Sequence, residues 1–303
     1  MRTINRYFGI ILLFSCFIGL LVPSVGDKTS PIVIFSLAFI IFNSYFKISF
    51  SVESLLRDFT LSLKFWFLRY VLVPLASFFI FKWISDFYAP VLLLSFLLPA
   101  AVSSPSFSAI FGGKPELSLK ILVYSSFLAV LTIPLLMSLL LDPSIRVPAG
   151  SMLLTLVYTI ILPFLVHLPL RSIRFVKETA GRYNTLFTLA GLCTIFVVVT
   201  ARNKPEITGN IDLVGLFAVE ALLLYAVMYL AGYYMFYKQS HTIRRTFSVS
   251  SGANNIGLGV TITTLFFPGE MNIFFIVSQL AWVVMLIPLR RILGDQGRPG
   301  DYK

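Results

Sequence analysis

Apolar residues run through this chain in long blocks separated by short polar stretches. Blocks of about 17 to 25 mostly apolar residues have the length of a helix that crosses a bilayer. The sequence predicts ten such blocks, with approximate centres at Phe14, Ala38, Leu72, Leu98, Val130, Ile160, Thr194, Leu224, Gly257 and Trp282. We therefore predict an all-α membrane protein with ten transmembrane helices.

Two of these blocks, the fourth and the ninth, are interrupted near their centres by similar polar tetrapeptides. The fourth contains Val102-Ser103-Ser104-Pro105, and the ninth contains Val249-Ser250-Ser251-Gly252. In hydrocarbon, backbone groups freed by Pro or Gly must face protein, water or a ligand. We predict that helices 4 and 9 are broken at these points, which is typical of transporters built from inverted repeats.

Composition and charge agree with a membrane protein. The chain is 57% hydrophobic and only 12% charged, and its mean hydropathy is +0.89. With the N-terminus placed in the cytoplasm, 18 of the 24 lysines and arginines fall on the inner side and five on the outer side. This bias predicts cytoplasmic termini and explains the net charge of +11 without nucleic-acid binding. The first block lacks a small-residue cleavage site, and the small size favours a bacterial or archaeal inner membrane.

Five helices in each half is an odd number, so the second half enters the membrane from the opposite side. Three pairs give similar offsets: Val102 and Val249 (147), Pro134 and Pro288 (154), and Arg69 and Glu220 (151). We predict one transporter unit over residues 1–293, with repeat 1 at about 7–142 and repeat 2 at about 149–290. The tail 294–303 is polar, and its end resembles the start of an epitope tag.

The two breaks carry the polar side chains expected of a binding site. Ser104-Pro105 predicts a half-helix start with Ser104 as N-cap and Pro105 first in the helix. Such an N-terminus favours an anionic group. The candidate substrate-binding residues of the breaks are Val102, Ser103, Ser104, Ser106, Asn254 and Asn255. The alternative is that these small polar residues only join helices to one another.

Longer motifs at the breaks resemble the bile acid:sodium symporter family. They are Leu98-Pro99-Ala100-Ala101-Val102-Ser103-Ser104, and Arg245-Thr246 followed by Ser251-Gly252-Ala253-Asn254-Asn255 and Gly257-Leu258. The resemblance extends over roughly residues 7–289. It implies a panel of helices 1, 2, 6 and 7 and a core of helices 3–5 and 8–10. It further implies that helices 4 and 9 cross, with two sodium ions behind the crossing and an organic anion in front. By the same resemblance, Gln279 on the tenth helix roughly aligns with a polar position of the family, so we add it to the expected substrate-binding residues.

The chain departs from this family at the sodium ligands. The ninth-helix Glu is missing, the family's Ser-Asn pair is Ser104-Pro105, and a fifth-helix Thr is Leu122, whereas Ser118 is retained. A degenerate ion site would comprise Ser104, Ser118, Ser250, Ser251 and Asn254. Sodium needs several hard oxygens, so the loss of the charged one argues against sodium coupling. The sequence predicts no other cofactor or metal.

Arg69 lies in the third helix, where the resemblance places a sodium-ligating Gln five residues before Pro74. A guanidinium within a span usually faces the bundle interior and has a partner. One hypothesis is that Arg69 takes the place of the bound cation. Another is that it pairs with Glu220, the acidic residue near the middle of the eighth span. The alternative is that Arg69 extends its side chain toward an aqueous crevice while Glu220 does likewise or is protonated.

These features predict a secondary active transporter of a small organic anion, either bile-acid-like or another carboxylate or sulfate. Transport would proceed by alternating access, with membrane lipids as the other partners and a monomer favoured. The coupling stays open among sodium at a depleted site, protons at Glu220, and none. A non-transporting membrane sensor on the same fold is the other candidate. The chain has no HExxH, GxSxG or close carboxylate pair in its spans, so we do not expect an enzyme.

Overall fold

The computed structural model describes residues 2–46, 59–85, 87–141, 148–267 and 269–293. The described part is helical, and it contains an isolated backbone bridge but no strand. Six of its helical stretches are long and apolar enough to cross a membrane: Phe59–Lys82, Pro115–Leu140, Ala149–Leu170, Arg174–Arg202, Ile211–Tyr234 and Gly269–Leu289. Ile10–Leu21, Ser30–Tyr45, Tyr88–Leu97 and Ile256–Phe266 are apolar but shorter. The predicted tail 294–303 lies outside the described residues.

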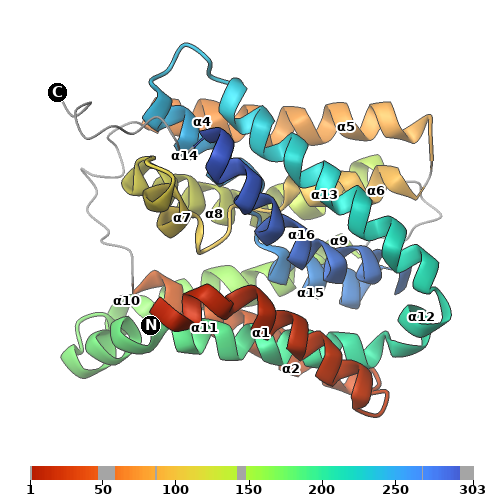
Figure 1. Cartoon of the computed structure of the whole chain (residues 1–303). Helices are drawn as coiled ribbons and strands as arrows, with labels where there is room; N and C mark the ends of the chain where they lie inside the picture. Colours follow the sequence, from red (N-terminus) through yellow and green to blue (C-terminus); the bar gives the residue numbers. More distant parts are fainter. Residues whose placement is uncertain (1, 47–58, 86, 142–147, 268, 294–303) are drawn as a thin grey trace. The chain divides into compact units, whose positions relative to one another are not determined.

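Figure 1 labels the helices in their order along the chain. The first half contains α1 (Arg2–Leu21), α2 (Ser30–Tyr45), α4 (Phe59–Phe67), α5 (Val73–Lys82), α6 (Tyr88–Leu97), α7 (Ser104–Ile110) and α8 (Pro115–Leu140). The second half contains α9 (Ala149–Leu156), α10 (Leu162–Leu170), α11 (Arg174–Arg202), α12 (Lys204–Gly209), α13 (Ile211–Tyr234), α14 (His241–Gly252), α15 (Ile256–Phe266) and α16 (Gly269–Leu293). The all-α prediction is confirmed, while the ten-helix inverted repeat stays a prediction.

The chain forms two compact units. The first comprises residues 1–50, 130–215 and 256–277, and the second comprises residues 51–129, 216–255 and 278–303. Three helices, α8, α13 and α16, run from one unit into the other. The predicted division into panel and core helices stays a prediction.

Close helix packing holds the first unit together. α11 lies against both α1 and α2 (Figure 1). Gly19 allows the α1–α11 approach, since a Cβ there would lie 2.7 Å from Thr200 Cβ and from the Val197 carbonyl oxygen. Asn184 Nδ2 also donates to the Asn43 carbonyl at 2.5 Å. Small residues and interhelical hydrogen bonds are how helices associate within a membrane, where no hydrophobic effect drives them together.

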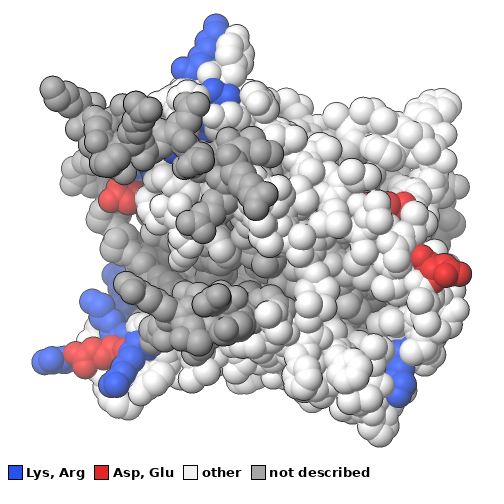
Figure 2. All heavy atoms as spheres, in the orientation of Figure 1, with Lys and Arg blue, Asp and Glu red and all other residues white. Residues whose placement is uncertain are grey.

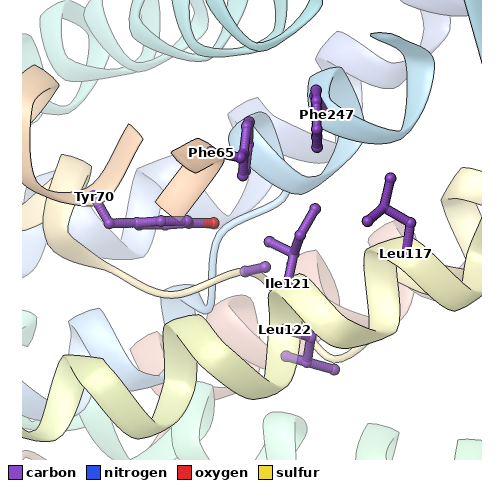
Figure 3. Packing of buried hydrophobic residues seen from close by; sticks show 7 residues of the cluster. Phe65, Tyr70, Leu117, Ile121, Leu122 and Phe247 are labelled. Carbon is purple, nitrogen blue, oxygen red and sulfur yellow. The ribbon is translucent and has the colours of Figure 1, made fainter. Parts of the chain in front are cut away.

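The second unit has an aromatic and aliphatic core between α4, α8 and α14. The rings of Phe65 and Phe247 stack with centroids 4.4 Å apart. Leu117 and Ile121 of α8 are buried in the same cluster (Figure 3). The face of the molecule shown in Figure 2 carries few charged side chains among its described residues. Large apolar side chains such as Leu223 are exposed on the surface. An apolar exterior of this kind suits contact with lipid.

A π turn over Leu68–Leu72 joins α4 to α5 and places Arg69. Pro74 follows it and lacks the N–H that would bond to the carbonyl of Tyr70 in a regular helix. The Val73 N–H instead bonds to the Leu68 carbonyl, five residues back. A second π turn, Val157–Ile161, precedes Pro163 in the same way. Single π turns are frequent at functional sites, because they redirect side chains within a helix.

Candidate functional site

Helices 4 and 9 are broken where the sequence predicts. α6 ends at Leu97 and α7 begins at Ser104, while α14 ends at Gly252 and α15 begins at Ile256. The two breaks meet in the second unit as a short antiparallel bridge between Ala100 and Asn254. The Ala101 N–H donates to the Ala253 carbonyl at 2.6 Å, and the Asn255 N–H donates to the Pro99 carbonyl at 2.8 Å. The breaks therefore satisfy part of each other's freed backbone, as a membrane interior requires.

The guanidinium of Arg69 lies at this bridge. Its Nε donates to Ser251 Oγ at 2.7 Å, and its Nη1 donates to the Phe96 carbonyl at 2.7 Å. Its Nη2 donates to the Ser251 carbonyl at 2.8 Å and makes a longer contact of 3.4 Å with Asn254 Oδ1. One rigid donor group thus connects the end of α6 to the end of α14 and to the break that follows α14.

Arg69 is a buried cation with neutral partners. Its side chain is 1% exposed, and its charge lies 4.9 Å from the ring centre of Tyr70 and 5.3 Å from that of Phe96. In the part of the chain that the structure describes, no carboxylate lies within ion-pair distance of it. Carbonyl and hydroxyl oxygens and aromatic faces therefore supply the compensation that a counterion usually gives.

The predicted pair of Arg69 with Glu220 is wrong. The Glu220 carboxylate instead accepts a hydrogen bond from the Tyr88 hydroxyl at 2.6 Å. Among the described residues, the Arg69 guanidinium donates to Ser251, Phe96 and Asn254. The physical reason is that the Phe96 and Ser251 carbonyls lie within hydrogen-bond distance of Arg69, so its buried donors are satisfied without a carboxylate.

A second polar group is formed by the hydroxyls of Ser104, Ser118 and Ser250. Ser118 Oγ lies 3.3 Å from Ser104 Oγ and 3.1 Å from Ser250 Oγ, and all three side chains are fully buried. Beside them, the Tyr70 hydroxyl donates to the Ser250 carbonyl at 2.8 Å. We call Ser104, Ser118 and Ser250 the serine cluster. It joins α7, α8 and α14 within the second unit.

The predicted degenerate ion site is therefore divided between two groups. Ser104, Ser118 and Ser250 form the serine cluster, whereas Ser251 and Asn254 are partners of Arg69. The oxygens of Ser251 and Asn254 that a cation would need already accept hydrogen bonds from a guanidinium. The serine hydroxyls bond to one another and include no charged oxygen. These residues do not fit sodium, which requires several converging hard oxygens.

A glycine-lined contact fixes the ninth-helix break against α13. A Cβ on Gly252 would lie 2.4 Å from the ring of Tyr229, and a Cβ on Gly232 would lie 2.5 Å from Ser251 Cβ and the Phe247 carbonyl oxygen. Ser251 Oγ donates to the Met228 carbonyl at 2.8 Å. α13 and α14 therefore approach so closely that Ser251 can bond to both Met228 and Arg69.

The predicted substrate-binding residues differ in accessibility. Ser106 is exposed, and Val102, Ser103 and Asn255 are half-buried. Three others are buried, namely Ser104, Asn254 and Gln279. Asn254 is engaged internally, because its Nδ2 donates to the Ser95 carbonyl at 2.8 Å. Substrate binding stays a prediction for all seven residues. Val102, Ser103, Ser106 and Asn255 are more accessible to a substrate than the three buried residues.

The predicted start of α7 is one residue late. The helix begins at Ser104 and not at Pro105, and Ser103 in the cap position makes no capping hydrogen bond with its side chain. The Ser104 hydroxyl accepts from Ser118, so the serine cluster uses the group expected to cap the helix. With only seven residues, α7 has a small dipole, and it provides little attraction for an anion.

Sequence reasoning missed the backbone acceptors and Tyr70. The carbonyls of Phe96, Ser250 and Met228 hold the site together, but every residue has a carbonyl, so no residue type marks them. Pro74 was a usable signal for the π turn that turns Arg69 and Tyr70 inward. The second unit also contains buried polar atoms without a hydrogen-bond partner among the described residues, namely Tyr225 Oη, Ser278 Oγ and Trp282 Nε1.

A multi-pass helical membrane protein with two broken helices meeting at a polar centre is a transporter architecture. The profile of the sodium bile acid symporter family matches residues 34–210, more than half of the chain. The chain belongs to this family. It is 25% identical over 198 residues to the uncharacterized protein YbaS of Bacillus subtilis (strain 168). That match covers 62% of this chain and spans 63% of the relative's length.

Proposed function

We propose that the protein carries a small organic anion by alternating access and that Arg69 replaces a bound cation at the crossing of helices 4 and 9. The observation that carries this proposal is the guanidinium bound to the Phe96 carbonyl and to the hydroxyl and carbonyl of Ser251. A tethered arginine is always charged, and it provides five donors in a fixed geometry. It therefore supplies permanently the charge that a transported ion supplies only when bound.

Arg69 also argues against a sodium ion at the same oxygens. Two unit positive charges within about 4 Å of each other repel strongly in a low-dielectric interior. A sodium ion would have to displace the guanidinium from Ser251, and the displaced arginine would then lack its buried acceptors. The proposed transport is therefore independent of sodium.

The same charge supports an anionic substrate. Arg69 brings a positive charge into the second unit without a carboxylate partner in the part the structure describes. A nearby anion is therefore electrostatically favoured, especially where water is excluded. We propose that the substrate contacts Val102, Ser103, Ser106 and Asn255, the accessible side chains of the two breaks.

Counterflow in proteoliposomes tests this function. Vesicles loaded with unlabelled taurocholate, or with smaller carboxylates and sulfonates, would be diluted into the labelled compound in sodium-free or sodium-containing buffer. We expect exchange of at least one anion at equal rates in both buffers. Asn255→Ala should weaken exchange, whereas Asn210→Ala, an exposed asparagine outside the breaks, should not. Exchange of none of the anions, or a strict sodium requirement, would contradict the proposal.

A membrane sensor is the second candidate, favoured by the engagement of Asn254 with both Arg69 and Ser95. A polar centre so fully bonded is suited to holding one conformation. Thermal stabilisation by an anion that shows no counterflow would support the sensor, and counterflow would support the carrier.

We further propose that both termini lie in the cytoplasm, a placement supported by the lysines and arginines of the inner loops. In a variant without Cys16 and Cys193, a cysteine at Lys177 should react with an impermeant thiol reagent only after the membrane is opened. A cysteine at Lys204 should react in intact cells.

A further inference from the structure

Glu220 is a membrane carboxylate with one oxygen bonded and one oxygen unpaired. It lies near the middle of α13, and its side chain is half-buried. Oε1 accepts from the Tyr88 hydroxyl at 2.6 Å. Oε2 is buried and has no hydrogen-bond partner among the described residues. An unpaired carboxylate oxygen in such a position carries a desolvation cost that a bound proton would remove.

The surroundings of Glu220 are apolar and aromatic. On α13 itself, the residues within one turn on either side are Leu216, Phe217, Ala218, Val219, Ala221, Leu222, Leu223 and Leu224. The Phe217 ring stacks on Phe87 at 5.6 Å, and Phe87 meets Tyr88 edge-on. Tyr88 of α6 is the titratable group bonded to Glu220, and no lysine, arginine or histidine of the described part forms an ion pair with it.

The Tyr88–Glu220 bond joins α6 to α13 directly, whereas Arg69 links the same two helices indirectly, through Ser251 of α14. Eight residues after Tyr88, α6 presents the Phe96 carbonyl to Arg69. Eight residues after Glu220, α13 presents the Met228 carbonyl to Ser251, which accepts from Arg69. The two links are therefore about 12 Å apart along each helix. α6 and α13 are therefore joined at two places. One contains the fixed charge of Arg69, and the other contains the ionisable carboxyl group of Glu220.

We propose that Glu220 is the proton-binding group that couples transport to the proton gradient. The inference rests on the proposed carrier function and names its coupling ion. A proton adds to Oε2, which turns the carboxylate into a neutral acid and leaves Oε1 as the acceptor for Tyr88. At 2.6 Å this bond has the length of a charge-assisted hydrogen bond, which is about twice as strong as a neutral one. Protonation therefore weakens the Tyr88–Glu220 link and leaves the Arg69 link unchanged.

A pH gradient across proteoliposomes tests the coupling. In sodium-free buffer, the wild type should accumulate the anion that it exchanges in counterflow when the outside is made acidic. Glu220→Gln is neutral at every pH, so it should lose this accumulation and keep the counterflow. Asp212→Asn, at an exposed acid on the same helix, should behave as the wild type does. Accumulation by Glu220→Gln equal to that of the wild type would overturn the inference while the carrier function stood.

Infrared difference spectroscopy tests proton binding without a substrate. On acidification, the wild type should gain a protonated-carboxyl band that Glu220→Gln lacks, and Tyr88→Phe should shift that band. Identical spectra for the wild type and Glu220→Gln would overturn the inference even if no transported anion were found. If the wild type gains the band, Glu220→Gln lacks it and the wild type shows no counterflow, Glu220 binds a proton, but the carrier function and its coupling to protons are both rejected.

Discussion

Arg69 and Ser251 are bonded twice, through Nε to the serine hydroxyl at 2.7 Å and through Nη2 to the serine carbonyl at 2.8 Å. The hydroxyl of the same serine donates to the Met228 carbonyl at 2.8 Å. Ser251 therefore connects the guanidinium to α13 by hydrogen bonds. The Phe96 carbonyl connects the guanidinium to α6. This geometry makes Arg69 a structural centre of the second unit.

Replacing Arg69 by lysine should destabilise the protein although the charge is kept. A lysine ammonium is compact and cannot bond to the Phe96 carbonyl and both Ser251 oxygens in the planar arrangement of a guanidinium. We expect Arg69→Lys to lower the free energy of unfolding by about 1.5–3 kcal/mol, because buried acceptors lose their donors. Denaturant titration in detergent measures the change. Arg182→Lys, at an exposed arginine, is the control and should shift the value by about 0.5 kcal/mol or less.

Gly232→Ala should separate α13 from α14. The added Cβ would lie 2.5 Å from the Phe247 carbonyl oxygen and from Ser251 Cβ, so the helices must move apart at a cost of about 1–3 kcal/mol. Gly215 lies on the same helix and has open space around it. Gly215→Ala should stabilise the helix by about 0.5–1 kcal/mol. Thermal unfolding of both variants decides the point, and equal effects would contradict the close packing.

The serine cluster should contribute to stability through mutual hydrogen bonds. Ser118→Ala removes the hydroxyl that lies between Ser104 and Ser250, so it should cost about 1–2 kcal/mol. Ser138 is on the same helix, but it is exposed and bonds to the Leu135 carbonyl of its own helix. Ser138→Ala should change the free energy of unfolding by about 0.5 kcal/mol or less. A Ser118→Ala protein as stable as Ser138→Ala would argue against the cluster.

The helix breaks could be predicted from the sequence because Pro, Gly and Ser disrupt a helix through local chemistry. Ser104-Pro105 and Ser251-Gly252 lie within one residue of the ends of α7 and α14. The all-α membrane class could also be predicted, because long apolar blocks are visible from residue type alone. The grouping of Ser104, Ser118 and Ser250 came from the family resemblance, and the structure brings these three residues together.

The partner of Arg69 could not be predicted because the competing acceptors are backbone atoms. A charge-based argument finds Glu220 as the acidic residue of a neighbouring span, but it does not count the carbonyls that two broken helices release. The repeat offset relates Arg69 to Glu220 by position, and equivalent positions in two repeats need not touch. The π turn at Leu68–Leu72 also changes the direction of Arg69, and no periodicity in the sequence shows it.

The most direct test of Arg69 as a built-in cation is the melting temperature of the purified protein in sodium chloride and in potassium chloride at equal ionic strength. A ligand that binds only the folded state raises the melting temperature, and the rise grows with the logarithm of the ligand concentration once that concentration exceeds the dissociation constant. Because the guanidinium already occupies the oxygens of Ser251 and Phe96, we expect the same melting temperature in both salts. A melting temperature that rises with sodium concentration and not with potassium would contradict it.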